Sequence, residues 1–156
     1  MEINSASESF SSMNPQKQNK IMVEITTSYE GGLRCKSIHG PSGVTLETDA
    51  PIDNNGKGET FSPTDLVATA LGSCMLTIMG IVADRRDIQL DGLNIQVGKI
   101  MSEDMPRRIA KLPVRIDMPL SADSPLKDLF INAALTCPVH QSLSGDIEIP
   151  IDWVWN

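Results

Sequence analysis

An uncharged run at residues 66–83 constrains the fold of this 156-residue chain more than any other feature of the sequence. A helix that crosses a bilayer needs about 20 predominantly apolar residues, so the run is close to that length. It contains small and polar residues, including Thr69, Gly72 and Thr77, and the chain has no second run of this kind. We therefore expect a helix at the centre of one domain or at a subunit interface, and no membrane span.

The residues before this run predict where the helix begins. The Ser62 side chain can cap the free backbone amides, Pro63 suits the first helical position, and Asp65 completes a capping box. Apolar residues then recur at helical spacing and predict a buried stripe with Cys74 at its middle: Val67, Leu71, Cys74, Ile78 and Ile81. The helix is expected to end between Asp84 and Asp87.

Alternating and turn-forming residues predict the other elements. Three strands separated by glycine-containing turns are expected from residue 21 to 26, 33 to 39 and 44 to 48, as an antiparallel meander. Two more strands are expected at 93–100 and 109–118, and a last one at 147–155. A second helix should begin at Ser124-Pro125 and stop at Cys137-Pro138, followed by a helical turn at 140–143. The order βββ-α-ββ-α-β predicts an α+β fold.

The ends and the charge of the chain limit its surroundings. Residues 1–19 are rich in Ser, Asn and Gln, which predicts a disordered polar tail before a single domain at 20–156. The tail lacks the apolar segment of a secretory signal, so we expect a cytoplasmic protein. A net charge of −7 and a pI near 4.7 argue against nucleic acid or an anionic membrane surface as a partner.

Three cysteines are the candidates for chemistry. In a reducing compartment a disulfide between any two of them is more typical of catalysis than of structure. Cys137 precedes Pro138 at a predicted helix start, where backbone amides lower a thiol pKa. The simpler interpretation treats buried cysteines as small hydrophobic residues, and we expect this for Cys35. A zinc set of Cys35, His39, Cys137 and His140 is an alternative, but its spacing is loose and no metal is expected.

Two motifs resemble a known family. The segment at 62–74, Ser-Pro-Thr-Asp-Leu-Val-Ala-Thr-Ala-Leu-Gly-Ser-Cys, is similar to the helix that carries the first cysteine of the OsmC/Ohr proteins, the osmotically inducible and organic hydroperoxide resistance proteins. Cys137-Pro138-Val139-His140 is similar to their second Cys-Pro motif. The resemblance covers residues 21–156 and implies the OsmC-like fold, with antiparallel sheets, two central helices and an intertwined homodimer.

The resemblance also implies an activity, a thiol-dependent peroxidase without a cofactor. Cys74 would be the thiolate that attacks an organic hydroperoxide, and Cys137 would then form a disulfide with it. A dithiol reductant of the lipoyl or thioredoxin type would restore both. Arg34 follows Gly31-Gly32, displaced by one residue from the family's catalytic arginine, and would hold the thiolate.

One departure from the family concerns the partner of that arginine. The hydroperoxide reductases have a Glu ten positions before the first cysteine, where this chain has Thr64. Glu59 and Asp65 are possible substitutes, but Asp65 points about 100° away from Thr64 and suits the capping role. The chain thus resembles the broader OsmC-like branch.

An alternative function is binding of a small apolar ligand with little or no turnover. Helix electrostatics alone would make Cys137 the more acidic cysteine, which leaves the order of acidity open.

Overall fold

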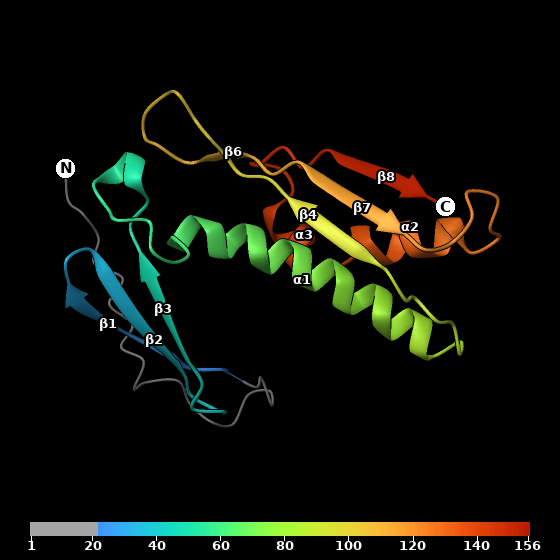
Figure 1. The fold of residues 1–156 in the computed structure, drawn as a ribbon, viewed down its shortest axis with the longest axis horizontal. Helices are drawn as coiled ribbons and strands as arrows, with labels where there is room; N and C mark the ends of the chain where they lie inside the picture. The colour runs from blue at the N-terminus through green and yellow to red at the C-terminus, as the bar shows by residue number, and fades with distance from the viewer. Residues whose placement is uncertain (1–21) are drawn as a thin grey trace, which may run out of the picture.

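The computed structural model describes residues 22–156, so the predicted tail at 1–19 and the residue at which the first strand was expected to begin lie outside the described residues. The described chain opens with the predicted antiparallel meander of β1 (Ile25–Gly31), β2 (Arg34–His39) and β3 (Thr45–Asp49). The predicted bounds of the first strand, 21–26, were wrong: residues 22–24 are not in a strand, and β1 continues to the turn at Gly31. This sheet lies beside the N-terminal end of the long helix and away from the other helices (Figure 1).

The long helix α1 (Pro63–Asp84) follows a loop that contains the short 3-10 helix η1 (Ile52–Asn54). The predicted capping box is confirmed. The Asp65 backbone N–H donates to Ser62 Oγ at 3.1 Å, and the Ser62 backbone N–H donates to Asp65 Oδ2 at 2.8 Å. Pro63 occupies the first turn, and the helix ends at Asp84, within the predicted bounds, with Arg85 as its C-cap residue.

The buried face of α1 differs from the predicted stripe. The buried residues are Ala68, Leu71, Gly72, Met75, Met79 and Ala83, whereas Ile81 is 40% exposed and Cys74 is only half-buried. Small residues turn inward because strand β4 packs closely on the helix: a Cβ at Gly72 would lie 3.0 Å from Val97 Cγ2. The prediction that Cys74 is buried at the centre of the stripe was therefore wrong for the described chain.

The second sheet has the order β4-β7-β8, formed by β4 (Asn94–Val97), β7 (Val114–Met118) and β8 (Ile151–Trp155). The strands predicted at 93–100 and 109–118 are each interrupted, which leaves a separate pair of β5 (Ile100–Met101) and β6 (Ile109–Lys111). Pro113 has no N–H for the ladder, although its carbonyl accepts from Gly98 N–H at 2.8 Å. A Cβ at Gly98 would lie 3.0 Å from Pro113 Cγ, so the two residues face each other at the interruption.

The last strand is shorter than predicted and runs parallel to β7, whereas all other strand pairs in the described chain are antiparallel. The predicted segment 147–155 is regular only from Ile151 because Pro150 interrupts the ladder, and Glu148 forms an isolated bridge with Lys111. The rings of Trp153 and Trp155 stack with centroids 5.5 Å apart against the core.

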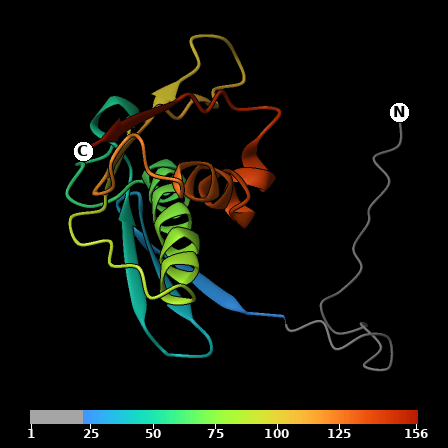
Figure 2. The ribbon, with the colours of Figure 1, turned by 90° about the vertical axis from the view of Figure 1, so that its right-hand side faces the viewer.

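Two further helices pack against α1. The first, α2 (Lys127–Leu135), begins later than predicted because Pro125 and Leu126 form a turn, in which the Lys127 N–H donates to Ser124 O at 3.1 Å, and α3 (Pro138–Leu143) follows α2. Helix α1 contacts α2, α3 and β4, and these elements enclose the core around Leu71, Met75 and Phe130 (Figure 2). This arrangement confirms the α+β class and brings the helix of Cys74 against the helix that begins at Cys137.

By length and composition alone, α1 could cross a membrane, and it is the one such helix in residues 22–156. A third of its most apolar window is buried within the chain. The same helix is the central element of the core, which is the arrangement that the sequence analysis expected.

Candidate thiol site

Cys74 and Cys137 come together where α1 meets α3. Cys137 is the N-cap residue of α3, and its side chain is fully buried. The backbone N–H of His140 donates to Cys137 Sγ at 3.3 Å. The Cys74 thiol, half-buried on α1, is the ionisable neighbour of Cys137. The structure therefore brings together the two cysteines that the sequence paired.

The surroundings of Cys137 act on its acidity in opposite directions. Burial raises the pKa of the Cys137 thiol, the backbone N–H groups of His140 and Val139 lower it, and the neighbouring Cys74 raises it again. The net effect is a raised pKa. Helix electrostatics act as the sequence indicated, but desolvation outweighs them, so Cys137 is held as a protonated thiol at neutral pH.

Arg34 lies at the start of β2, on the sheet that is separate from α3 (Figure 1). Its Nη2 atom forms ion pairs with Glu59 Oε2 and, at 3.7 Å, with Asp49 Oδ2. No hydrogen bond or ion pair within residues 22–156 joins Arg34 to Cys74 or Cys137. The predicted cation is thus held by carboxylates and does not reach the thiols within one chain.

The supporting residues near the start of α1 are arranged around a cation that the sequence analysis missed. Lys99 Nζ lies 2.6 Å from Asp65 Oδ1, 2.9 Å from Thr64 Oγ1 and 3.3 Å from Ser62 Oγ. Burial alone would raise the pKa of the Asp65 carboxyl, but hydrogen bonds from Lys99 and Ser62, together with the Lys99 charge, lower it below its usual value. Asp65 and Thr64 therefore bind Lys99. Glu59 and Asp65 were the two possible substitutes for the family's Glu, and only Glu59 contacts Arg34.

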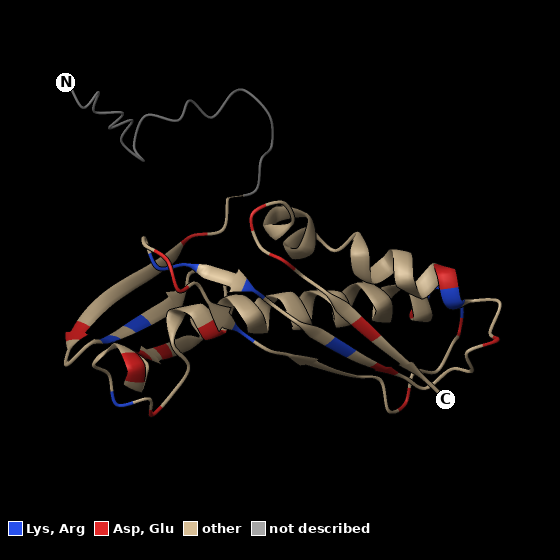
Figure 3. Cartoon of the chain, turned by 90° about the horizontal axis from the view of Figure 1, so that it is seen from above, with Lys and Arg blue, Asp and Glu red and all other residues tan. Residues whose placement is uncertain are grey.

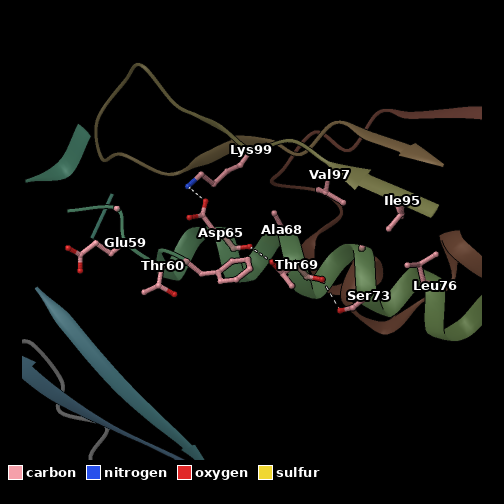
Figure 4. A pocket seen from close by; sticks show the side chains of 13 residues that line it. Glu59, Thr60, Asp65, Ala68, Thr69, Ser73, Leu76, Ile95, Val97 and Lys99 are labelled. Atoms are coloured by element: carbon pink, nitrogen blue, oxygen red, sulfur yellow. Dashed lines mark hydrogen bonds and ion pairs between the residues drawn. The ribbon is translucent and has the colours of Figure 1, made fainter. Parts of the chain in front are cut away.

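A groove of about 950 Å³ lies between α1, β4 and the loop that precedes α1 (Figure 4). Apolar side chains of Ala68, Leu76, Ile95 and Val97 line its walls, with Glu59, Asp65 and Lys99 toward one end. Neither cysteine is part of its lining. Cys74 lies on a different side of α1, toward α3.

The other sequence candidates do not form a site. Within residues 22–156, no three His, Cys, Asp or Glu side chains are grouped so as to hold a metal ion, so the zinc set is not assembled. Cys35 is a residue of β2, as predicted, and His39 bonds to Ser42 at the following turn. His140 is half-buried in the first turn of α3, where its backbone N–H donates to Cys137 Sγ.

Comparison with known proteins decides the family. The model of the OsmC-like protein family matches residues 56–152, a segment that contains both cysteines. A crystal structure from Psychrobacter arcticus 273-4, of a protein described as osmotic stress induced and as a detoxification response protein, is 43% identical with a TM-score of 0.78. The match covers 86% of this chain and 97% of that one. The chain belongs to the OsmC-like family.

More distant structures share the OsmC-like fold. An organic hydroperoxide resistance protein OsmC from Legionella pneumophila is 14% identical with a TM-score of 0.71, over 88% of this chain and 99% of that one. An organic hydroperoxide resistance protein from Elizabethkingia anophelis, with thiocyanate bound, is 16% identical with a TM-score of 0.71, over 87% and 97%. No curated protein matches this chain.

Two charged residues of this region were missed by the sequence analysis, for different reasons. Asp49 could have been found, because a hairpin that turns at 40–43 places residue 49 opposite Arg34, and the structure has this register. Lys99 gave no such signal, because it lies 34 positions from Asp65 and meets it only through the packing of β4 on α1.

Proposed function

We propose that this OsmC-like protein is a thiol-dependent peroxidase that reduces organic hydroperoxides. The observation that carries the proposal is the pairing of a half-exposed Cys74 with a buried Cys137 whose pKa is raised. A thiol that stays protonated is a poor first nucleophile, so Cys74 is the thiol that meets the peroxide. The names of the organic hydroperoxide resistance proteins that share the fold agree with this substrate class.

The reaction has three balanced steps. The Cys74 thiolate attacks the terminal oxygen of ROOH, the O–O bond breaks, and the products are the Cys74 sulfenic acid and RO⁻, which takes up a proton to become ROH. The Cys137 thiol loses its proton and attacks the sulfenic sulfur, which forms the disulfide and releases water. An external dithiol then supplies two electrons and two protons, and both thiols are restored. A lipoyl- or thioredoxin-type dithiol fits this step, and we propose a cytoplasmic location because such reductants maintain thiols there.

We further propose that the active form is a homodimer, because two apolar faces of the chain have no partner within it. One is the exposed face of α1, which has no charged residue between Asp65 and Asp84 (Figure 3). Its hydroxyls at Thr69, Ser73 and Thr77 each donate to the carbonyl four residues earlier, at 2.7–2.9 Å. Burial of these satisfied groups costs little, so the face can pack against another protein surface.

The second unpartnered face belongs to the sheet of β1, β2 and β3. Side chains alternate across a strand, so Ile25, Tyr29 and Leu46 share one face of the sheet, and all three are exposed. Arg34 lies on the same sheet, away from the thiols of its own chain. By the same alternation Arg34 belongs to the opposite face of this sheet, opposite Asp49 of β3. In the proposed dimer a second copy packs against α1 and around this sheet in a two-fold arrangement, so that Arg34 of one chain meets Cys74 of the other.

Subunit mixing tests the shared site. Chains with Cys74→Ser are expected to be inactive alone, and chains with Arg34→Ala are expected to keep only a small residual rate. After unfolding and refolding together, half of the dimers are mixed and each holds one intact site, so about a quarter of the wild-type activity should return. If Arg34 acted within its own chain, the mixture would keep only the residual rate.

The activity itself is tested on the full chain with tert-butyl hydroperoxide and a lipoyl dithiol. We expect hydroperoxide consumption, and a Cys74–Cys137 disulfide by mass spectrometry when the dithiol is omitted. Cys74→Ser should abolish consumption, whereas the matched control Cys35→Ser should react like the wild type. Unchanged consumption by Cys74→Ser would reject the peroxidase.

The groove supports a second candidate function, the binding of a small apolar ligand with little or no turnover. Its apolar walls include neither cysteine, so a ligand could occupy it without touching the thiols. This function predicts saturable binding of an apolar probe while both thiols remain reduced after exposure to the hydroperoxide. A Cys74–Cys137 disulfide under the same conditions would decide for the peroxidase.

A further inference from the structure

Two carboxylates of different character hold Arg34. Asp49 has no exposed side-chain surface, whereas Glu59 is 57% exposed. The antiparallel register of β2 and β3 places Asp49 directly opposite Arg34, and Glu59 comes from the loop that precedes α1. Arg34 Nη2 pairs with Glu59 Oε2, and it lies 3.7 Å from Asp49 Oδ2. One partner is therefore a fixed part of the sheet, and the other comes from the loop.

Asp49 also holds the backbone on both sides of this cluster. Its Oδ2 accepts the backbone N–H of Glu59 at 3.0 Å, and its own N–H donates to Phe61 O at 3.1 Å. The next residue, Ala50, donates its N–H to Leu33 O at 3.2 Å. Leu33 directly precedes Arg34 and has a positive φ of 64°, a strained value for a residue with a Cβ. The same short segment thus fixes the backbone before Arg34 and the loop that carries Glu59.

The ion pairs with Asp49 and Glu59 leave part of the Arg34 guanidinium available for other contacts. Both ion pairs involve Nη2, and within residues 22–156 neither Nε nor Nη1 of Arg34 donates a hydrogen bond. A guanidinium is planar and rigid, so holding one nitrogen restricts the directions of the others. We propose that Asp49 and Glu59 position Arg34, with Nε and Nη1 directed to the thiolate and the peroxide oxygens; this proposal rests on the proposed function.

Neither carboxylate comes from helix α1. Thr64, in the first turn of that helix, accepts a hydrogen bond from Lys99 at 2.9 Å instead. Arg34, the cation of the proposed reaction, and Lys99, the cation at the helix start, therefore have separate acidic partners. Asp49 and Glu59 are the partners of Arg34. Asp49 and Glu59 are positioning residues, because they act on the reacting atoms only through Arg34.

The test measures the rate constant for oxidation of Cys74 by tert-butyl hydroperoxide in single turnover, as a function of pH. We expect Glu59→Gln and Asp49→Asn each to lower the high-pH plateau by roughly tenfold, the range typical for residues that orient a reacting group. The conservative Glu59→Asp should recover part of the loss. The matched control is Asp53→Asn, which removes an exposed carboxylate from the same loop, where it pairs with Arg107 at 2.6 Å. This control should react like the wild type.

Repeating both substitutions in an Arg34→Ala background separates positioning from a general structural effect. If the carboxylates act through Arg34, neither substitution should lower the rate further in that background. A loss of the same size with and without Arg34 overturns the proposal, as do wild-type rates for both single variants. Should Asp49→Asn fail to fold, Glu59→Gln decides alone, because that side chain is exposed. A wild-type chain that does not react overturns the proposed function and this proposal together, whereas normal rates in both variants overturn only the proposal.

Discussion

The buried Cys137 thiol predicts a steep pH dependence for disulfide formation after Cys74 has been oxidised. Only the thiolate attacks a sulfenic sulfur, and burial raises the pKa of Cys137. Below the pKa of a thiol, its ionised fraction rises tenfold with each pH unit. We therefore expect the rate to increase about tenfold per unit between about pH 6 and pH 8, with no plateau in that range.

The size of the effect follows from the balance of contacts at the N-terminus of α3. The backbone N–H groups of His140, at 3.3 Å, and of Val139 favour the thiolate, whereas complete loss of exposed surface opposes it. A thiolate at an exposed helix N-terminus would instead have a pKa as low as about 3.5 to 7.5, and its rate would level off near neutral pH. The shape of the profile therefore distinguishes a buried cap from an exposed one.

The assay oxidises the reduced chain with one equivalent of tert-butyl hydroperoxide and quenches it with acid at intervals. Mass spectrometry then separates the sulfenic acid from the disulfide. Cys137→Ser is the control, because it should accumulate the Cys74 sulfenic acid at every pH. A disulfide rate that levels off below pH 7 would show that the helix amides outweigh burial, and the assignment of Cys137 as the second thiol would lose its physical basis.

Two further predictions concern the segment around the start of α1. The lowered pKa of Asp65 means that its carboxylate stabilises the fold above the unfolded pKa near 3.8, and that this contribution is lost as the pH falls through the lower folded pKa. Asp65→Asn should lower the free energy of unfolding by urea at pH 7 by at most about 1 kcal/mol, because the side chain is partly exposed. A difference that persists undiminished in acid would contradict this account. Gly56→Ala should destabilise the chain by roughly 1–3 kcal/mol and slow hydroperoxide reduction, because the new Cβ would lie 1.7 Å from Ala50 O and would displace the loop of Glu59. An unchanged urea midpoint and rate would show that the loop is not held as described.

Elements with strong local signals could be predicted from the sequence. The capping box at Ser62, the start of α3 at Cys137-Pro138 and the opening meander all depend on residues close together in the chain, and all are confirmed. The interrupted strands were missed because Gly98 and Pro113 disturb the ladder only when they face each other. Pro113 is itself a local sign of a break in a strand, but the residue that it faces lies 15 positions away and has no such sign.

The buried face of α1 could not be predicted because the helix is apolar on most sides. A helical period identifies the inner face only when polar residues mark the outer one. Here the outer face carries Ser and Thr whose hydroxyls bond to the helix itself, so neither face is marked by charge. The small residues that allow close packing, such as Gly72, selected the inner face instead.

The separation of the thiols from Arg34 within one chain leads to a prediction about assembly, which rests on the proposed function and the proposed dimer. Cys74 and Cys137 meet inside one chain through the packing of α1 on α3, so the proposed disulfide would join residues of a single chain. Arg34 lies on a sheet whose apolar face is exposed, and Asp49 and Glu59 hold it there before any thiolate is near. In the proposed dimer, association both buries the apolar faces and supplies the cation, so Cys74 gains its full reactivity only when a second chain is in place. Hydroperoxide reduction per chain should therefore decrease on dilution to concentrations at which the dimer dissociates, whereas a site contained within one chain would keep its rate.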